Sequence, residues 1–377
     1  MPNLIYLYTT GGANGGMNRL PSVCTVDYTS RSTNNRYAIA AQYDGMIKMF
    51  GEIPNHTSHI EHTYIFIDSV SDPGRLVINS HCDLFVVPHI ALALNHIHPD
   101  DIVVVRGGFR NWIPTITQIH DARKNWILFY RANTAHGHWP YWDITLNDLI
   151  DKPTPIKHGI QVPFNKPVNE SVFGYIDSPN VIHRDVDIMI GASHIHRKKG
   201  QCNVIKALEY FYATRGYAPK SILPGGFIRS IENSYIQSII NKPEINIVYA
   251  GPVKRPQLSM LMNHTKLFIH AGTGGQNDRS TLEAMACGCE VIITNPKSVA
   301  PFVRDNATIA VNSPEAISNI VYSKLSYYST NASELAANYK RCNGLYNVSI
   351  PQITGIVDFI SNNPVSNRDV SIQELVS

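Results

Sequence analysis

Apolar and polar residues follow one another along the chain in blocks that predict strands separated by helices. Short runs that are apolar throughout, at residues 4–8, 63–67, 84–87, 102–105 and 126–130, have the length of strands. Runs without polar alternation are typical of parallel strands that are covered on both faces. The segments between these runs are long enough for crossover helices. The first half of the chain therefore predicts a doubly wound α/β domain.

A proline-rich stretch interrupts this pattern near the middle of the chain. Residues 151–155 and 162–167 carry prolines, which break helices and central strands. After about residue 185 the alternation begins again, with a strand over 187–191 and a helix over 202–214 that ends at a glycine. We therefore expect a domain boundary between residues 151 and 185.

The second half continues with the same pattern of strands and helices. Further strands are predicted at residues 221–223, 245–249, 267–269 and 291–293. We expect an N-terminal domain over residues 1–165, a C-terminal domain over 180–354, and a C-terminal segment from about 355 to 377 that packs back on the first domain. Two doubly wound domains bind ligands at the carboxyl ends of their strands.

Composition excludes several classes of protein. Of the 377 residues, 44% are hydrophobic and 16% are charged, which is too apolar for a disordered chain. No apolar run approaches the ~20 residues that a membrane span needs. The net charge of +3 gives little support to nucleic acid as a partner. Peripheral membrane association and the oligomeric state stay open.

The start of the chain and its cysteines predict a cytoplasmic protein. The sequence begins Met1-Pro2-Asn3, without the basic and apolar regions of a secretory signal. Six cysteines are scattered with no C-x-x-C pair, which favours reduced, mostly buried thiols. Cys287-Gly288-Cys289 lacks the partners of a zinc site.

The stretch from Ala271 to Gly288 carries the strongest chemical signal. It is a glycine-rich loop after a strand, followed by a short helix of small residues that Asp278 or Ser280 can cap. Amide groups at a helix N-terminus bind anions, and Arg279 adds a charged partner for phosphate. Glu283, one turn further, can accept hydrogen bonds from sugar hydroxyls. The alternative is an ordinary loop with a solvated glutamate.

Residues 245–295 resemble the family 4 retaining glycosyltransferases. The resemblance rests on the G-x-V of residues 251–253 and on L-E-A-M-A-C-G at residues 282–288. Upstream, residues 190–200 are similar to the family's G-x-S-R-x-x-x-x-K-G segment. The resemblance implies the GT-B fold, with two Rossmann-like domains that face a central cleft. It also implies a UDP- or GDP-sugar co-substrate, no metal or other cofactor, and a glycan, protein or small molecule as acceptor.

The resemblance also assigns functions to individual residues. Glu283 matches the glutamate that holds the nucleotide ribose, and Lys199 matches the lysine that neutralises the donor diphosphate. Glycines of the first strand-to-helix loop bring backbone amides close to the diphosphate; the alternative for this loop is a flexible turn. The residues expected to bind the nucleotide sugar are Gly12, Gly15, Gly16, His194, Lys199, Val253, Gly275, Gln276, Asn277, Asp278, Arg279, Ser280, Thr281 and Glu283.

This sequence departs from the family pattern at two positions. The family's first motif glutamate falls on Gly275, and the next three positions are Gln276, Asn277 and Asp278. In the family this region contacts the transferred sugar, so the donor sugar cannot be assigned by resemblance. The family's arginine falls on His194, which is mostly neutral at pH 7 unless phosphate raises its pKa. The basic residues 196–198 either compensate or form a solvated turn.

The catalytic contact of the family is a histidine just after a strand of the N-terminal domain. Residues 126–130 lead into a segment in which His136 is the favoured candidate, with Arg131 and His138 as rivals. Lys199 completes the expected catalytic set. Asp185-Val186-Asp187 resembles the D-x-D of metal-dependent transferases, but it begins a strand, so we expect a structural role.

These observations predict a retaining hexosyl- or pentosyltransferase. Three other functions stay open: a non-catalytic nucleotide- or sugar-binding module, a sugar-nucleotide epimerase or phosphorylase of the same fold, and a base-modifying transferase that acts on DNA. The changes at Gly275 and His194 motivate the first of them. Steep salt dependence of duplex binding would support the last.

Overall fold

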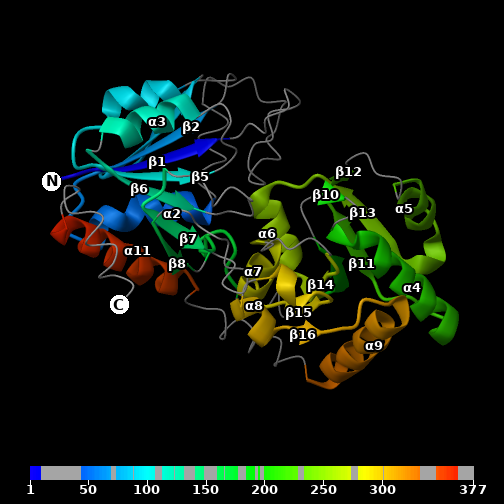
Figure 1. Cartoon of the computed structure of the whole chain (residues 1–377). Coiled ribbons are helices and arrows are strands. Elements are labelled where there is room, and N and C mark those ends of the chain that lie inside the picture. The colour runs from blue at the N-terminus through cyan, green and yellow to red at the C-terminus, as the bar shows by residue number, and fades with distance from the viewer. Residues whose placement is uncertain are drawn as a thin grey trace. The chain divides into compact units, whose positions relative to one another are not determined.

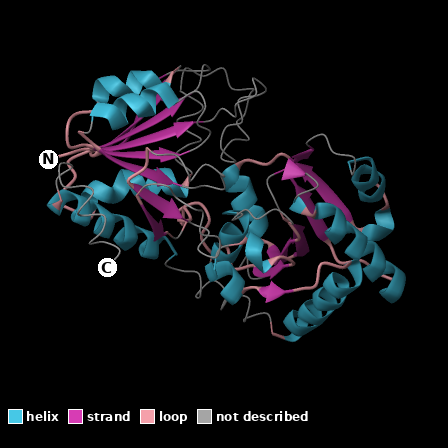
Figure 2. Cartoon of the chain, in the orientation of Figure 1, coloured by secondary structure: helices cyan, strands magenta, loops and turns pink. Residues whose placement is uncertain are grey.

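The computed structural model divides the chain into two compact units, each with its own mostly or wholly parallel sheet (Figures 1 and 2). Unit 1 comprises residues 1–169 and 345–377, and unit 2 comprises residues 170–344. The structure describes residues 1–9, 44–68, 74–87, 89–106, 113–122, 124–130, 141–147, 159–164, 166–176, 184–191, 194–195, 199–227, 233–272, 279–299, 301–331 and 345–363.

The sheet of unit 1 has eight strands in the order β3-β4-β2-β1-β5-β6-β7-β8. All neighbouring pairs are parallel except β3 and β4. The strands are β1 (Leu4–Thr9), β2 (Thr63–Asp68), β3 (Gly74–Asn79), β4 (Cys82–Val87), β5 (Ile102–Arg106), β6 (Trp126–Tyr130), β7 (Ile144–Asn147) and β8 (Ile160–Pro163). Apolar residues fill β5 and β6 on both faces, as predicted for covered parallel strands.

Helices cover both faces of this sheet. On one face α2 (Gly45–Glu52) lies beside α11 (Leu345–Asn362), although about 300 residues separate them in sequence (Figure 1). Ile353 and Val357 of α11 are fully buried in this layer. On the other face pack α3 (Ile113–Ala122) and a 3-10 helix, Ile90–His96. Burial of α11 against unit 1 makes the C-terminal helix part of this unit's core.

The sheet of unit 2 has six parallel strands in the order β13-β11-β9-β14-β15-β16. They are β9 (Val186–Ile190), β11 (Ser221–Pro224), β13 (Ile247–Gly251), β14 (Thr265–His270), β15 (Glu290–Ile293) and β16 (Thr308–Ile309). A separate short pair joins β10 (His194–Ile195) to β12 (Gly226–Phe227). The helices are α4 (Gln201–Arg215), α5 (Asn233–Ile240), α6 (Arg255–Asn263), α7 (Arg279–Ala286), α8 (Pro301–Asn306) and α9 (Pro314–Thr330).

Helices also lie on both faces of the second sheet. α4, α5 and α9 share one core layer, in which Leu208 and Phe211 of α4 are buried. α6 and α7 pack side by side and against β14 (Figure 1). The predicted end of α4 is confirmed, because Gly216 caps the helix with a φ of 74°. Two Rossmann-like parallel-sheet domains, the predicted fold class, are therefore confirmed.

Three local features differ from the sequence prediction. The strand expected from residue 245 begins at Ile247, because Pro243–Ile245 form a 3-10 turn that ends at Asn246 with a φ of 53°. Within the expected proline-rich break, Ile160–Pro163 form β8, which is possible because this strand lies at the sheet edge. Antiparallel β3 was not predicted, and its mostly exposed residues explain why.

The strand order places one switch point in each sheet. In unit 1 the chain leaves β1 toward β2 and returns on the other side at β5; in unit 2 it leaves β9 toward β11 and returns at β14. Loops that follow the two strands of a switch point diverge and leave room for a ligand at the carboxyl edge. Across the parts of the chain that the structure describes, the helices are too short or too polar to cross a bilayer.

Candidate functional site

Two loops meet at the switch point of unit 2. Residue Gly191 follows β9, and its amide donates to the carbonyl oxygen of Ile269 at 2.9 Å. Gln201, the first residue of α4, donates from Nε2 to the Gly191 carbonyl at 3.2 Å. The start of α4 is thereby fixed against the carboxyl end of β9.

Glycine at position 200 permits the closest approach in this region. Gly200 has a φ of 74°, and a Cβ atom added there would lie 1.9 Å from the carbonyl oxygen of Ala271, just after β14. Any side chain would therefore push apart the loop that precedes α4 and the loop that follows β14. Lys199, which stands immediately before this glycine, is half-buried. The structure thus brings the Lys199 segment to the loop that leads into α7.

Helix α7 begins at this carboxyl edge and presents several of the predicted residues. Arg279, Ser280, Thr281 and Glu283 all lie in its first two turns and are buried. Because α7 starts at Arg279, Ser280 is inside the helix, and the prediction that Ser280 caps it is wrong. The other proposed cap, Asp278, lies outside the described residues.

Glu283 is paired rather than solvated. Arg255, the first residue of α6, donates from Nη1 to Oε2 of Glu283 at 3.0 Å and from Nη2 to Oε1. The two side chains are 6% and 2% exposed. The alternative of an ordinary loop with a solvated glutamate is therefore wrong. A bidentate guanidinium holds the buried carboxylate in one orientation.

Local sequence places Arg255 where it can reach Glu283. The amide of Lys254 donates to Oε1 of Gln257 at 3.0 Å, which closes the start of α6, and Pro256 suits the first turn of a helix. The ring of Phe173 lies under the guanidinium, 4.3 Å from its Cζ. Neither Arg255 nor Phe173 was predicted from the sequence. One general rule could have pointed to such a residue: a buried glutamate needs a partner of opposite charge.

The remaining predicted residues have mixed outcomes. Val253 is half-buried in the loop between β13 and α6, and His194 lies on β10. The residues outside the described ranges are Gly12, Gly15, Gly16, Arg131, His136, His138, Gly275, Gln276, Asn277 and Asp278. The predicted site is thus described only in part, on the α4 and α7 sides of unit 2.

A second buried cluster, also not predicted from the sequence, lies at the switch point of unit 1. Arg106 ends β5, and its Nη1 lies 3.3 Å from the Tyr6 hydroxyl and 3.6 Å from the Asp44 carboxylate. Its guanidinium also faces the rings of Tyr8 and Tyr130 at 4.7 and 5.3 Å. The carboxyl edge of this sheet therefore carries a buried, fully compensated cation.

Burial and charge set the ionisation in this cluster. Burial alone would lower the pKa of Arg106, but the nearby oxygens of Tyr6, Tyr8 and Asp44 raise it above its usual value. Burial raises the pKa of Tyr6 far above its ordinary range. At neutral pH Arg106 is charged and Tyr6 is a neutral hydrogen-bonding group.

The Asp185-Val186-Asp187 segment has the structural role that was expected. Asp185 pairs with Lys220 at 2.7 Å and with His264 at 3.2 Å, and Asp187 pairs with Lys266 at 2.7 Å. Lysine pairing lowers the pKa of Asp185. Among the residues that the structure describes, no three His, Cys, Asp or Glu side chains are grouped to hold a metal ion.

The four described cysteines, at positions 82, 202, 287 and 289, are buried and are not joined in disulfides. Burial raises the pKa of the Cys289 thiol to about 11 and that of Cys82 to about 12. Thiols with such pKa values are protonated at neutral pH and are poor nucleophiles.

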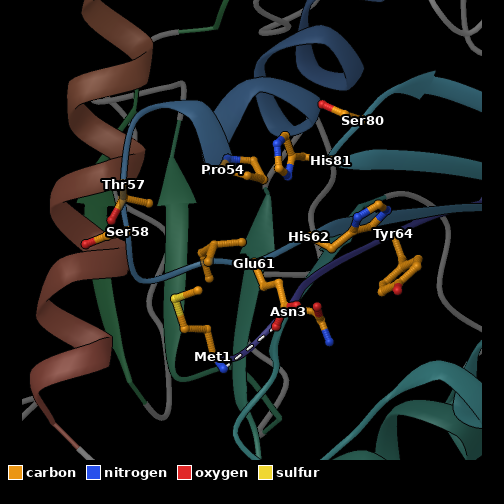
Figure 3. A pocket seen from close by; sticks show the side chains of 11 residues that line it. Met1, Asn3, Pro54, Thr57, Ser58, Glu61, His62, Tyr64, Ser80 and His81 are labelled. Atoms are coloured by element: carbon orange, nitrogen blue, oxygen red, sulfur yellow. Dashed lines mark ion pairs between the residues drawn. The ribbon is translucent and has the colours of Figure 1, made fainter.

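A polar cavity of about 590 Å³ lies elsewhere in unit 1 (Figure 3). Asn3, His62, Tyr64 and His81 line it, and the Met1 amino group pairs with Glu61 at its rim. These residues come from the amino-terminal ends of β1 and β2 and from the β3–β4 turn. The cavity is therefore at the opposite edge of this sheet from the switch point of unit 1. Because parallel sheets bind ligands at their carboxyl edge, we assign the candidate site to the α4–α7 region.

Residues 176–339, within unit 2, match the model of the family described as glycosyl transferases group 1. This part of the chain is similar to group 1 glycosyltransferases. No curated protein matches the sequence. This family agrees with the resemblance seen in residues 245–295.

Solved structures of glycosyltransferases share the fold over nearly the whole chain. Sucrose-phosphate synthase from Thermosynechococcus elongatus has a TM-score of 0.63 and 13% identity, covering 94% of this chain and 98% of that one. Anabaena HepE in complex with UDP and glucose has a TM-score of 0.59 and 10% identity, covering 94% and 100%. Trehalose 6-phosphate synthase from Burkholderia multivorans has a TM-score of 0.58 and 9% identity, covering 100% and 97%. At these identities the likeness shows the GT-B fold.

Proposed function

We propose that the chain is a retaining glycosyltransferase that moves a sugar from a nucleotide-diphosphate sugar to an acceptor hydroxyl without a metal ion. One observation carries the proposal. Glu283, buried and paired with Arg255, stands on α7 directly after the glycine-rich loop, at the carboxyl edge of the unit that is similar to group 1 glycosyltransferases. A fixed carboxylate at this edge is suited to accept hydrogen bonds from ribose hydroxyls.

The donor in this proposal is a UDP- or GDP-sugar. Anabaena HepE, which shares the fold, has been solved with UDP and glucose. Lys199 and Arg279, together with amides at the N-terminus of α7, bind the diphosphate. They stabilise the negative charge that develops on the leaving group as the glycosidic bond breaks. Val253 and residues 275–281 contribute to the rest of the donor site.

The acceptor in this proposal binds to unit 1. His136 and Arg131 are the catalytic candidates there, and Gly12, Gly15 and Gly16 bring backbone amides to the donor and acceptor. Retention of configuration is what the resemblance to family 4 implies, by substitution on the same face of the sugar. The segment that contacts the donor sugar has Gly275 where the family has a glutamate. The proposal therefore does not specify whether the transferred sugar is a hexose or a pentose.

The test is an assay of turnover with a panel of UDP-, GDP- and ADP-sugars, in which release of the nucleoside diphosphate is measured. We expect one donor class to be consumed, and Glu283→Gln and Lys199→Ala to lower kcat/KM for that donor by about 10- to 100-fold. Lys220→Ala is the matched control, because Lys220 pairs with Asp185 at the opposite sheet edge. Unchanged activity in both site variants would overturn the proposal.

A second candidate is a nucleotide-binding module without transferase activity. Gly275 and His194, which stand where the family has a glutamate and an arginine, favour it. This function predicts calorimetric binding of a nucleoside diphosphate with no consumption of any donor in the same panel. Turnover above the no-enzyme rate that Glu283→Gln abolishes would exclude it.

A further inference from the structure

Arg255 and Glu283 form a two-pronged pair between α6 and α7. The guanidinium nitrogens Nη1 and Nη2 each contact one carboxylate oxygen of Glu283. Twenty-seven residues lie between them in sequence, and the two helices that carry them pack side by side. The pair therefore fixes both the distance between the helix starts and the rotation of the Glu283 carboxylate.

The pair is not optimised for stability alone. The Nε of Arg255 is buried and has no hydrogen-bond acceptor among the described residues. Buried ion pairs gain little net stability when their remaining polar atoms are unsatisfied. Phe173 covers the guanidinium face at 4.3 Å, which restricts how the side chain can turn. An arginine held this tightly, at the cost of an unpaired donor, is suited to orient its partner.

The lone pairs of the Glu283 carboxylate determine how many hydrogen bonds it can still accept from a ligand. An ionised carboxylate has about four acceptor positions, two on each oxygen. Arg255 occupies one position on each oxygen, so one position on each is left. Two acceptors at a fixed spacing match two neighbouring hydroxyl groups, such as the 2′ and 3′ hydroxyls of a ribose.

We propose that Arg255 is a positioning residue that makes Glu283 selective for ribonucleotides over 2′-deoxyribonucleotides. Arg255 acts through Glu283 and does not contact the ribose. Without Arg255 the Glu283 carboxylate can rotate, and the carboxylate oxygen that accepts from the 2′ hydroxyl then moves away from it. This inference rests on the proposed function, because it requires a nucleotide at Glu283.

The experiment measures the affinities of UDP, GDP and ADP and of their 2′-deoxy forms by titration calorimetry. It uses the full chain, the variants Arg255→Gln, Arg255→Lys and Glu283→Gln, and the double variant Arg255→Gln/Glu283→Gln. Arg304→Gln is the matched control, because Arg304 pairs with the neighbouring Asp305 on the surface. Far-ultraviolet circular dichroism and thermal melting establish which variants are folded.

We expect the native chain to prefer the ribonucleotide by about 10- to 100-fold, as for loss of a hydrogen bond to a charged group. Arg255→Gln brings this ratio close to one while the affinity for the deoxynucleotide changes little. Arg255→Lys, which keeps the charge but loses the two-pronged geometry, restores part of the ratio. In the Glu283→Gln background, Arg255→Gln has no further effect on the ratio.

Two results separate failure of this inference from failure of the proposed function. If the native chain binds none of the six nucleotides, the proposed function is wrong, and with it the inference. If the native chain prefers ribonucleotides and Arg255→Gln weakens both forms equally, the role of Arg255 is structural and only the inference is overturned. Should Arg255→Gln fail to fold, the ratio in folded Arg255→Lys decides: an unchanged ratio contradicts the inference.

Discussion

Gly200 and Gly216 adopt the same left-handed backbone conformation at the two ends of α4, each with a φ of 74°. They differ in what surrounds them. A Cβ atom at Gly200 would lie 1.9 Å from the Ala271 carbonyl oxygen, whereas a Cβ atom at Gly216 meets nothing within 4 Å. The two positions thus separate the conformational cost of a side chain from the cost of a close approach.

We predict that Gly216→Ala lowers the free energy of unfolding by about 1 kcal/mol, the cost of a left-handed alanine. Gly200→Ala is expected to cost about 3 kcal/mol or more, because the added methyl group also displaces the Ala271 loop. Urea denaturation measures both values. Equal costs at the two glycines would show that the loops are not in contact.

Arg106 offers a residue-scale prediction in unit 1. Arg106→Met removes the cation that lies 3.6 Å from the Asp44 carboxylate, which is 1% exposed, and we expect a loss of about 3–5 kcal/mol of unfolding free energy. Arg75→Met is the control, because Arg75 is largely exposed in its pair with Asp83 and should cost less than about 1 kcal/mol. Chemical denaturation of both variants makes the comparison. Similar losses would contradict a buried, compensated cation at this switch point.

Residue patterns in the sequence identified Glu283 but not its partner. The L-E-A-M-A-C-G segment marks Glu283 because its spacing is local to one helix. Arg255 lies on another helix, and only the packing of α6 against α7 brings the two together. Arg106 was missed for the same reason, since its partners Tyr6 and Asp44 are distant in sequence. Contacts between elements are set by tertiary structure, which residue spacing does not encode.

At the scale of elements, Glu290 joins β15 to α9 and to β16. Its carboxylate contacts Lys324 at 2.7 Å, the Thr308 hydroxyl at 2.6 Å and the Tyr328 hydroxyl at 2.8 Å. Burial would raise the pKa of Glu290, but the hydrogen bonds from Lys324, Thr308 and Tyr328 outweigh it and lower the pKa. The ionised form is therefore the one that stabilises this corner of unit 2.

The lowered pKa gives this contact a defined pH dependence. A folded-state pKa below the unfolded value of about 4.3 stabilises the protein above that pH, and the stabilisation is lost as the pH falls through the folded pKa. We predict that the native chain is more stable than Glu290→Gln at pH 7 and that the difference shrinks below about pH 4. Unfolding free energies between pH 7 and pH 3 measure it. A difference that does not change with pH would contradict the prediction.

Elements were predictable where burial gives a strong pattern. β1, β2, β5, β6 and β14 are apolar throughout and lie inside their sheets, so their sequences are distinctive. The edge strands β3 and β8 were not predicted, because their polar and exposed residues resemble those of loops. The structure thus adds these two sheet edges and also the short buried strand β7, which the sequence pattern did not predict.

At the scale of the whole molecule, the two units have separate cores and one of them carries the candidate donor site. A nucleoside diphosphate at a concentration of 100 times its Kd should stabilise the unit that binds it by about 2.7 kcal/mol. We predict slower amide hydrogen exchange in α4, α6 and α7 of unit 2, with β2 and β4 of unit 1 little changed. Exchange followed by mass spectrometry, with and without UDP or GDP, measures this. Equal protection of both sets of elements would contradict a donor site in unit 2.

The most direct measurement of the central claim is a crystal structure of the full chain with UDP or GDP. We predict that the diphosphate lies at the N-terminus of α7 beside Lys199, and that two ribose oxygens lie about 2.7 Å from the Glu283 carboxylate while Arg255 keeps its pair. A nucleotide in the cavity lined by His62 and His81, or one bound in unit 2 without a contact to Glu283, would contradict the account.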